Sequence, residues 1–227
     1  MFRTKKEDQL KYAKSSFSQS GEDLIVDFIF GQLKIDKPGY IDIGAHHPFY
    51  LNNTSIFYKR GSRGINIEPD PSLFEKFKKF RKGDINLNIG IGEEPGVSEF
   101  YVMNAPTLNT FSKEQVETYK SEGNYHIKEV KQIKVDTVQN ILTKYNGGVF
   151  PDFMSLDAEG IDELVLKSID YNNKPAVICV ETLSFSSTGK GVKNNEIIAF
   201  LQTHGYFLYA DTFINSIFVS SDKWSNQ

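Results

Sequence analysis

Two apolar segments in the second half of the chain are each followed by acidic side chains. Asp157 and Glu159 come directly after Phe153–Leu156, and Glu181 comes directly after Ala176–Val180. If both segments are strands of one parallel sheet, these carboxylates meet at the sheet edge where open α/β folds bind their ligands. Converging carboxylates bind a hard cation such as Mg²⁺, share a proton or hold a positively charged ligand. Stabilisation of the following helix by its dipole is the competing role.

A glycine and an acidic residue follow two earlier apolar segments. Gly44 comes after Tyr40–Ile43, and Glu68 comes after Gly64–Ile67. Glycine lets the backbone approach a ligand closely, and a carboxylate at the second strand end can accept both hydroxyls of a ribose. The G-x-G-x-x-G pattern of dinucleotide enzymes is missing, since only one glycine is present. The pair therefore predicts a nucleoside ligand without a diphosphate.

The elements that must position these residues alternate between strand and helix. A helix over Ser15–Leu33 comes first, with Ser20 and Asp23 at capping-box spacing. Short apolar strands then alternate with amphipathic helices, apart from a less regular middle section over 97–135 with two alternating, exposed strands. This order predicts a parallel, doubly wound sheet covered by helices on both faces. The closing strands, Phe207–Ala210 and Ser216–Val219, predict an antiparallel C-terminal hairpin.

Composition limits the class of protein. The 227 residues carry a net charge of −3, with 39% hydrophobic and 24% charged residues, as expected of one soluble domain without affinity for nucleic acid. We divide this single domain into an N-terminal helical cap over 1–36 and a core over 37–227. No apolar run approaches the ~20 residues of a membrane helix. The only cysteine, Cys179, suits a reducing compartment, so we expect a cytoplasmic protein.

Six motifs in order resemble those of FkbM-type S-adenosylmethionine-dependent methyltransferases, particularly the short forms associated with bacterial surface glycans. The likeness runs from about residue 18 to about residue 181. The motifs begin at Ser18 (SQSGED), Tyr40 (YIDIGAHHP), Tyr58 (YKRG), Gly64 (GINIEPDP), Asn109 (NTFS) and Ser155 (SLDAEG).

The resemblance implies a class I methyltransferase fold, Rossmann-like, with a mostly parallel seven-stranded sheet. It also implies S-adenosyl-L-methionine as cofactor and O-methylation of a sugar hydroxyl. The acceptor would be a sugar, a nucleotide sugar or a glycan. The cofactor residues carried over from the family motifs are Asp42, Gly44, Ala45, Glu68, Asp157 and Glu159.

Several further side chains are candidates for the two ligands. Asn88 and Ile89 could meet an adenine edge, and Gln19 and Glu22 could close over the ammonium of the cofactor. Thr54 and Ser55 begin a short helix that could meet its carboxylate. Aromatic rings stack on sugars, and polar side chains bind hydroxyls. The candidate acceptor residues on this basis are Tyr50, Asn109, Phe111, Glu181 and Phe185.

A sugar hydroxyl is a poor nucleophile, so a group must take its proton as the methyl is transferred. His46 or His47, with an ordinary pKa near ~6.5, could be that base. Alternatively, Mg²⁺ held by Asp157 and Glu181 could bind the hydroxyl and lower its pKa. The histidine base is favoured, and Asp157 is a catalytic candidate in either case.

Two other functions fit the same residues. One is a metal-dependent hydrolase that uses Asp157, Glu159 and Glu181. The other is a non-catalytic partner subunit that keeps the methyltransferase fold. A methyltransferase should bind S-adenosylhomocysteine, whereas the hydrolase should not. A partner subunit should show no turnover.

Overall fold

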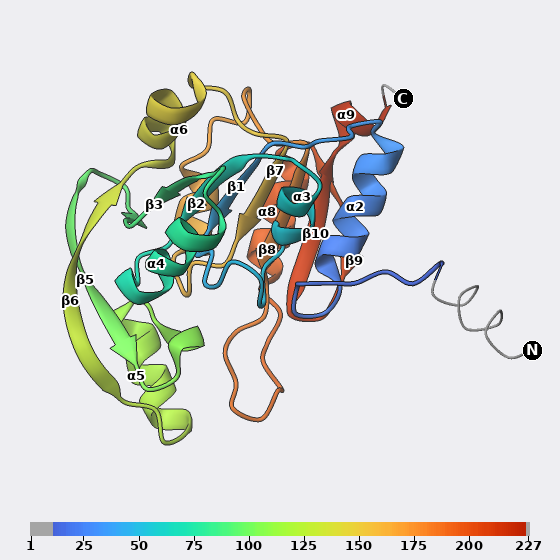
Figure 1. Ribbon diagram of the computed structural model, residues 1–227. Coiled ribbons are helices and arrows are strands. Elements are labelled where there is room, and N and C mark those ends of the chain that lie inside the picture. Colours follow the sequence, from blue (N-terminus) through green and yellow to red (C-terminus); the bar gives the residue numbers. More distant parts are fainter. Residues whose placement is uncertain (1–10, 226–227) are drawn as a thin grey trace, which may run out of the picture.

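The computed structural model describes residues 11–225 and shows a seven-stranded sheet between two layers of helices (Figure 1). The strand order is β3-β2-β1-β7-β8-β10-β9, and β10 runs antiparallel to both neighbours. The fold is α/β and mostly parallel, as predicted. Its strands are β1 Tyr40–Ile43, β2 Gly64–Ile67, β3 Ile85–Leu87, β7 Phe153–Leu156, β8 Val177–Glu181, β9 Tyr206–Asp211 and β10 Asn215–Ser220.

Strands β1 and β7 lie side by side at the centre of the sheet, in register from Tyr40 opposite Phe153 to Ile43 opposite Leu156. From β1 the chain proceeds outward to β2 and β3, then returns to β7 and proceeds outward on the other side. The carboxyl ends of β1 and β7 therefore form the switch point at which doubly wound sheets bind ligands.

Helices cover both faces because the central strands are buried on both sides. On one face α2 and α3 pack against Phe153, Val177 and Ile217. On the other face α6, α7 and α8 pack against Ile41, Met154 and Ile178. The bounds of the helices are α2 Glu22–Gln32, α3 Ser55–Lys59, α4 Pro71–Phe80 beside β3, α6 Val138–Asn146, α7 Asp162–Lys167, α8 Asn195–Thr203 and α9 Ser221–Ser225.

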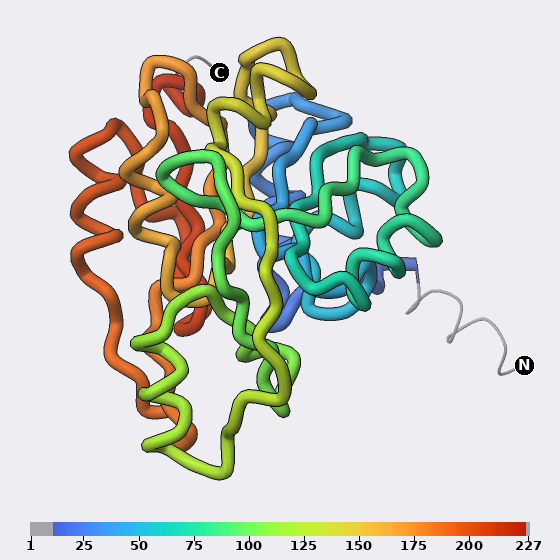
Figure 2. The backbone as a smooth tube through the Cα atoms, turned by 90° about the vertical axis from the view of Figure 1, so that its left-hand side faces the viewer, coloured from blue at the N-terminus to red at the C-terminus, as the bar shows by residue number. Residues whose placement is uncertain are grey.

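A second, three-stranded sheet is inserted between β3 and β7, with strand order β4-β6-β5. In Figure 2 this inserted unit faces the viewer, with its two long strands in green and yellow. Its small core includes Tyr119, against which Phe185 packs from the loop after β8, with ring centroids 4.7 Å apart. The unit comprises β4 Gly90–Ile91, β5 Gly96–Met103, the 3₁₀ turn Pro106–Leu108, α5 Lys113–Glu122 and β6 Ile127–Asp136.

The first helix is shorter than predicted. It begins at Glu22 rather than at Ser15, and Gly21, with φ 93°, is its N-cap residue. Asp23 does not complete a capping box with Ser20. Its carboxylate instead accepts hydrogen bonds from Ser16 Oγ (2.6 Å) and Phe17 N (2.7 Å), which fold the preceding segment back onto the helix. Of the predicted N-terminal cap, residues 1–10 lie outside the described chain.

Helix α2 lies directly on the sheet, in the same layer as α3, with Val26, Ile29 and Phe30 fully or almost fully buried. Within residues 11–225 no helix is long and apolar enough to cross a membrane.

Candidate active site

A cavity of about 560 Å³ lies at the carboxyl ends of the parallel strands. Its wall is formed by residues that follow β1, β2, β7 and β8, and by the inserted unit. One part of the wall is therefore the edge of the sheet where the sequence predicts the functional residues. The other part consists of side chains of the inserted unit, such as Phe111 and Gln115.

The loop after β1 folds tightly over the end of the sheet. We call residues 44–47 the glycine loop. Gly44 and Ala45 both donate their backbone N–H to Ile67 O at 3.1 Å, and Gly44 has φ 76°. A Cβ atom on Gly44 would overlap the carbonyl oxygen of Asp157. Glycine is therefore required here both by backbone conformation and by the close approach of the segment after β7.

Glu68 lies at the end of β2, on the cavity wall and almost fully buried. Its Oε2 accepts a hydrogen bond from His46 N and its Oε1 accepts one from Asp70 N, each at 2.7 Å. Each oxygen keeps a second lone pair, so the carboxylate can still accept the hydroxyls of a ribose. Burial raises the pKa of Glu68 to about 8, against the opposing effect of the two backbone hydrogen bonds.

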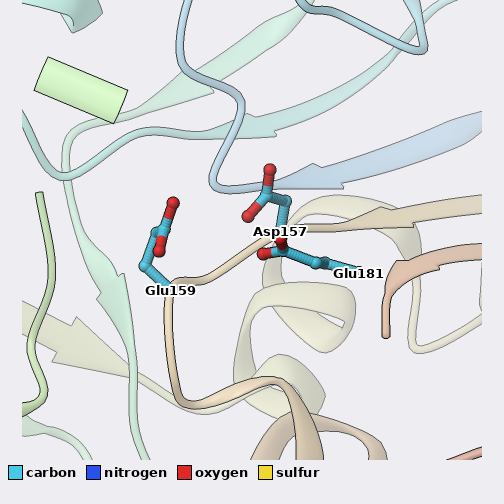
Figure 3. Close-up of side chains that lie close together, drawn as sticks. All are labelled: Asp157, Glu159 and Glu181. Carbon is cyan, nitrogen blue, oxygen red and sulfur yellow. The ribbon is translucent and has the colours of Figure 1, made fainter. Parts of the chain in front are cut away.

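Asp157, Glu159 and Glu181 form a carboxylate cluster, with ligand atoms all within 4.8 Å of one another. Figure 3 shows the three side chains turned toward a common space from the ends of β7 and β8. Glu159 has φ 46°, and its Oε2 accepts a hydrogen bond from Tyr119 Oη at 2.6 Å. The inserted unit thus fixes one member of the cluster.

Burial raises the pKa of all three carboxyl groups, and repulsion between neighbouring carboxylates raises them further. A hydrogen bond joins the side chains of Asp157 and Glu181, and it raises the pKa of Glu181 while lowering that of Asp157. The two carboxyl groups therefore interact directly, and both have raised pKa values. Within the described chain, the cavity wall includes no Lys or Arg to offset these carboxylates. Three oxygen donors at this spacing fit a hard divalent cation.

The two predicted histidines occupy different positions. His46 is on the cavity wall, and burial, together with the charges of His47 and Lys76, lowers its pKa below the ordinary value. It is therefore neutral at physiological pH, as a general base must be. His47 is not on the wall, and its Nδ1 accepts a hydrogen bond from Phe49 N at 3.2 Å. Of the two candidates, only His46 therefore lies on the wall of the cavity.

The two N-terminal candidates, Gln19 and Glu22, also differ in position. Gln19 is on the cavity wall, whereas Glu22 is buried behind it. Glu22 Oε1 accepts hydrogen bonds from Thr212 Oγ1 (2.7 Å) and Asn215 Nδ2 (3.1 Å). Burial alone would raise the pKa of Glu22, but these bonds and that from Ser20 N outweigh it and leave the pKa below its usual value. Glu22 thereby attaches the N-terminal segment to the turn between β9 and β10.

Asp42, Thr54 and Ser55 lie behind the glycine loop rather than on the cavity wall. All three are buried, and Thr54 Oγ1 donates to Asp42 Oδ2 at 2.8 Å. Asn88 and Ile89 are not on the wall either, because Asn88 Nδ2 donates to the carbonyls of Glu68 and Pro69 at 2.9 Å.

Four of the five predicted acceptor residues line the cavity, namely Asn109, Phe111, Glu181 and Phe185. Asn109 Nδ2 donates to Asp70 Oδ2 at 3.1 Å, which joins the inserted unit to the start of α4. Tyr50 is 61% exposed and stands beside His46 and His47, outside the wall.

Asn53 and Gln115 are among the residues of the wall that sequence reasoning missed. Asn53 Nδ2 donates to Ser155 Oγ at 3.2 Å, and Gln115 packs against Gly160. Asn53 directly precedes the short helix predicted from Thr54, and that place was a usable signal. Gln115 had none, because it lies on a polar helix of the inserted unit.

The seven-stranded sheet, with β10 antiparallel to its neighbours, is that of a class I methyltransferase fold, and the cavity lies at its switch point. The chain matches the methyltransferase FkbM domain over residues 42–208 and belongs to that family. Its cofactor is S-adenosylmethionine, and the family match favours methyl transfer over the metal-dependent hydrolase. No curated protein matches the chain.

Solved structures with a similar fold include three methyltransferases. A TehB-like SAM-dependent methyltransferase from Corynebacterium glutamicum is 11% identical over 96% of this chain and 95% of that one, with a TM-score of 0.45. A precorrin-6y C5,15-methyltransferase from Geobacter metallireducens is 13% identical over 86% and 87%, with a TM-score of 0.43. The 1,6-didemethyltoxoflavin-N1-methyltransferase from Burkholderia thailandensis, solved with S-adenosylhomocysteine, is 8% identical over 91% of both chains, with a TM-score of 0.38.

The residues present fit this cofactor. Glu68 offers a carboxylate held by two backbone hydrogen bonds for ribose hydroxyls, and Gly44 lies on the cavity wall at the end of β1. Asp157 and Glu181 supply acceptors for a positively charged group such as an ammonium. The cavity, at about 560 Å³, lies within the usual range for small-molecule sites of ~300–1,000 Å³.

Proposed function

We propose that this protein transfers a methyl group from S-adenosylmethionine to a hydroxyl of a sugar in bacterial surface-glycan biosynthesis. The observation that carries the proposal is the composition of the wall outside the cofactor residues. Phe111 and Phe185 offer aromatic faces for a sugar ring, while Asn109 and Gln115 offer amides for its hydroxyls. The reaction would take place in the cytoplasm, in keeping with the single, buried cysteine.

When bound, the cofactor would supply an electrophilic methyl carbon, which an acceptor oxygen would attack in line with the breaking bond to sulfur, with S-adenosylhomocysteine as the leaving group. The residues of the protein must then hold that oxygen at near-attack distance and accept its proton. Aromatic faces restrict the tilt of the sugar ring, and the amides restrict its rotation. Phe185 packs on Tyr119 and Tyr125, so the loop after β8 and the inserted unit form one side of the cavity together.

Two groups on the wall can assist the loss of the proton, His46 by accepting it and the carboxylate cluster through a bound cation. His46 is the first candidate, because its lowered pKa leaves it neutral at physiological pH. The carboxylate cluster is the second, because Asp157 and Glu181 would hold Mg²⁺ with oxygen ligands. In the presence of that ion, the acceptor hydroxyl would be more acidic.

Two measurements test the function. Calorimetric titration of the full chain with S-adenosylhomocysteine, with and without Mg²⁺, tests the cofactor. Release of S-adenosylhomocysteine from S-adenosylmethionine is then followed with free sugars, nucleotide sugars and glycans as acceptors. Turnover with a sugar acceptor supports the proposal. Cofactor binding without turnover on any of these acceptors supports the partner-subunit alternative.

A further inference from the structure

A buried arginine lies behind the glycine loop, away from the cavity wall. Arg81 is the C-cap residue of α4, and it is the largest described side chain with less than 2% exposure. Its Nε donates to Oδ2 of Asp84, which is also fully buried, at 2.8 Å. A buried guanidinium requires both a compensating charge and acceptors for its remaining N–H groups. The acceptors available to Arg81 belong mainly to the segment after β1.

The two terminal nitrogens of Arg81 reach the start and the end of residues 48–55. Nη1 lies 3.3 Å from Pro48 O, 3.4 Å from Asn52 Oδ1 and 3.4 Å from Ser55 Oγ. Nη2 donates to Thr54 Oγ1 at 3.1 Å. Ser55 Oγ also donates to the carbonyl of Pro48. One planar group therefore holds the two ends of this segment together.

The contacts continue from Arg81 to the cavity. Asn52, which accepts from Arg81, donates its Nδ2 to Ala45 O at 3.1 Å and to Asp42 Oδ2 at 3.0 Å. Ala45 stands between Gly44 and His46, both of which are on the wall. Two hydrogen bonds thus separate the guanidinium from the backbone that faces the cavity.

The segment has little regular structure to hold its own shape. Between β1 and α3 it forms only one isolated bridge, between His47 and Tyr50. Gly44, His46 and Leu51 all adopt left-handed backbone conformations. For non-glycine residues such conformations persist only where surrounding contacts impose them. Arg81 provides several of those contacts at once.

We propose that Arg81 is a positioning residue for cofactor binding. Its guanidinium fixes residues 44–55 from behind, so that Gly44, His46 and Asn53 face the cavity. The inference rests on cofactor binding at this cavity. His46 N in turn holds Glu68, so the same guanidinium also sets the orientation of the ribose acceptor. Lysine cannot replace it, because one ammonium group cannot span the acceptors that a planar fork reaches.

The test compares Arg81→Lys with Tyr40→Phe in the full chain. Tyr40 Oη accepts from Arg81 Nη2 at 2.7 Å and donates to Asp84 Oδ2 at 2.7 Å, so it belongs to the same buried cluster but not to residues 44–55. Calorimetry gives the affinity for S-adenosylhomocysteine, urea unfolding gives stability, and hydrogen exchange gives the local opening of residues 44–55.

We expect Arg81→Lys to weaken S-adenosylhomocysteine binding by about 10-fold or more. Amide exchange should become faster in residues 44–55 and stay unchanged in β7 and β8, and saturating S-adenosylhomocysteine should slow it again. Tyr40→Phe should lower stability yet keep the affinity within about twofold of wild type. A merely structural role would lower stability in both variants without this difference in affinity.

If Arg81→Lys does not fold, Ser55→Ala tests the same bridge, because it removes one acceptor of Nη1 and the bond to Pro48. Its expected effect is a roughly 3-fold to 10-fold loss of affinity with faster exchange confined to residues 44–55. Wild-type affinity with unchanged exchange in the tested variant would overturn the proposal, as would faster exchange throughout the sheet. Failure of the wild-type chain to bind S-adenosylhomocysteine would overturn the cofactor assignment itself, and the positioning role with it.

Discussion

The backbone N–H of His46 donates to Glu68 Oε2 at 2.7 Å, and this bond joins the glycine loop after β1 to the acidic residue after β2. Asp70 N donates to the other carboxylate oxygen at the same distance. The carboxylate is therefore oriented before any ligand binds. Ligand binding then costs little conformational entropy at the Glu68 side chain. The same bond makes the orientation of Glu68 dependent on the shape of the glycine loop.

Replacement of Glu68 should weaken cofactor binding. We expect Glu68→Ala to raise the dissociation constant for S-adenosylhomocysteine by about 10-fold to 100-fold, because the ribose hydroxyls lose a charged acceptor. Calorimetric titration measures the change. Glu75→Gln is the matched control, since Glu75 lies on α4, is largely exposed and pairs with Lys78. Equal affinities for wild type and Glu68→Ala would show that the ribose does not lie against this residue.

Cofactor affinity should depend on pH through the same side chain. Burial raises the pKa of Glu68 to about 8, so below that pH the free protein holds a proton that ribose hydroxyls must displace. Affinity should therefore increase with pH up to about 8 and then level off. Titrations near pH 7 in buffers of different ionisation enthalpy should show proton release on binding. In Glu68→Gln this release should disappear, and its persistence would assign the proton to another group.

Loss of the His46 imidazole should affect turnover more than binding. A general base contributes about 10²-fold to 10⁴-fold, so His46→Ala should lower kcat within that range while affinity for S-adenosylhomocysteine changes little. Because the pKa of His46 is lowered, the wild-type rate should fall only at pH values below the ordinary histidine range. The measurement is release of S-adenosylhomocysteine with an acceptor that wild type methylates. His47→Ala, on the outer side of the loop, is the comparison.

A metal-assisted reaction gives the opposite pattern. If Mg²⁺ at Asp157 and Glu181 activates the hydroxyl, EDTA should abolish turnover and Mg²⁺ should restore it. Asp157→Asn should then be the more damaging variant, and His46→Ala should keep a rate close to wild type. This combination would contradict the histidine base and leave the cofactor assignment intact.

The carboxylate cluster should reduce stability at higher pH. The folded-state pKa of Glu181 is raised by burial and by Asp157 and Glu159, so the folded protein binds its proton more tightly than the unfolded chain does. The stability that this proton confers is complete below the unfolded pKa near ~4.5 and is lost as pH rises toward the folded pKa. Glu181→Gln should therefore raise the melting temperature at pH 8 relative to wild type, and raise it less at pH 5.

Thermal unfolding monitored by circular dichroism at both pH values measures this difference. Glu117→Gln, which removes an exposed carboxylate paired with Lys120 on α5 and outside the cavity wall, is the control. An equal effect of Glu181→Gln at both pH values would mean that the cluster does not titrate as a unit.

Much of the main sheet could be predicted because its signals are local. The apolar runs at Tyr40–Ile43, Gly64–Ile67 and Phe153–Leu156 coincide with β1, β2 and β7, since a strand buried on both faces requires an uninterrupted apolar run. The two-residue strand β4 was missed because Gly90 and Ile91 carry no such pattern. The N-terminal helix was overestimated because polar residues from Ser15 onward neither forbid nor require a helix.

The site was predictable to the extent that it follows strand ends. Gly44, Glu68, Asp157, Glu159 and Glu181 all line the cavity where the order of elements placed them. The predicted ligand contacts of these residues stay predictions until a complex is measured. Asp42 shows the limit of the motif, because a residue inside a motif can lie behind the loop that carries it.

The sequence by itself determined the alternation of strands and helices and the polar residues that end each strand, because both depend on neighbours within a few positions. The tertiary structure decided which ends meet. Pairing of β1 with β7 brings Gly44 against Asp157, although more than a hundred residues separate them. The position of Arg81 behind residues 44–55 was likewise decided only by packing, because its acceptors in that segment, such as Pro48 O, lie far away in the sequence.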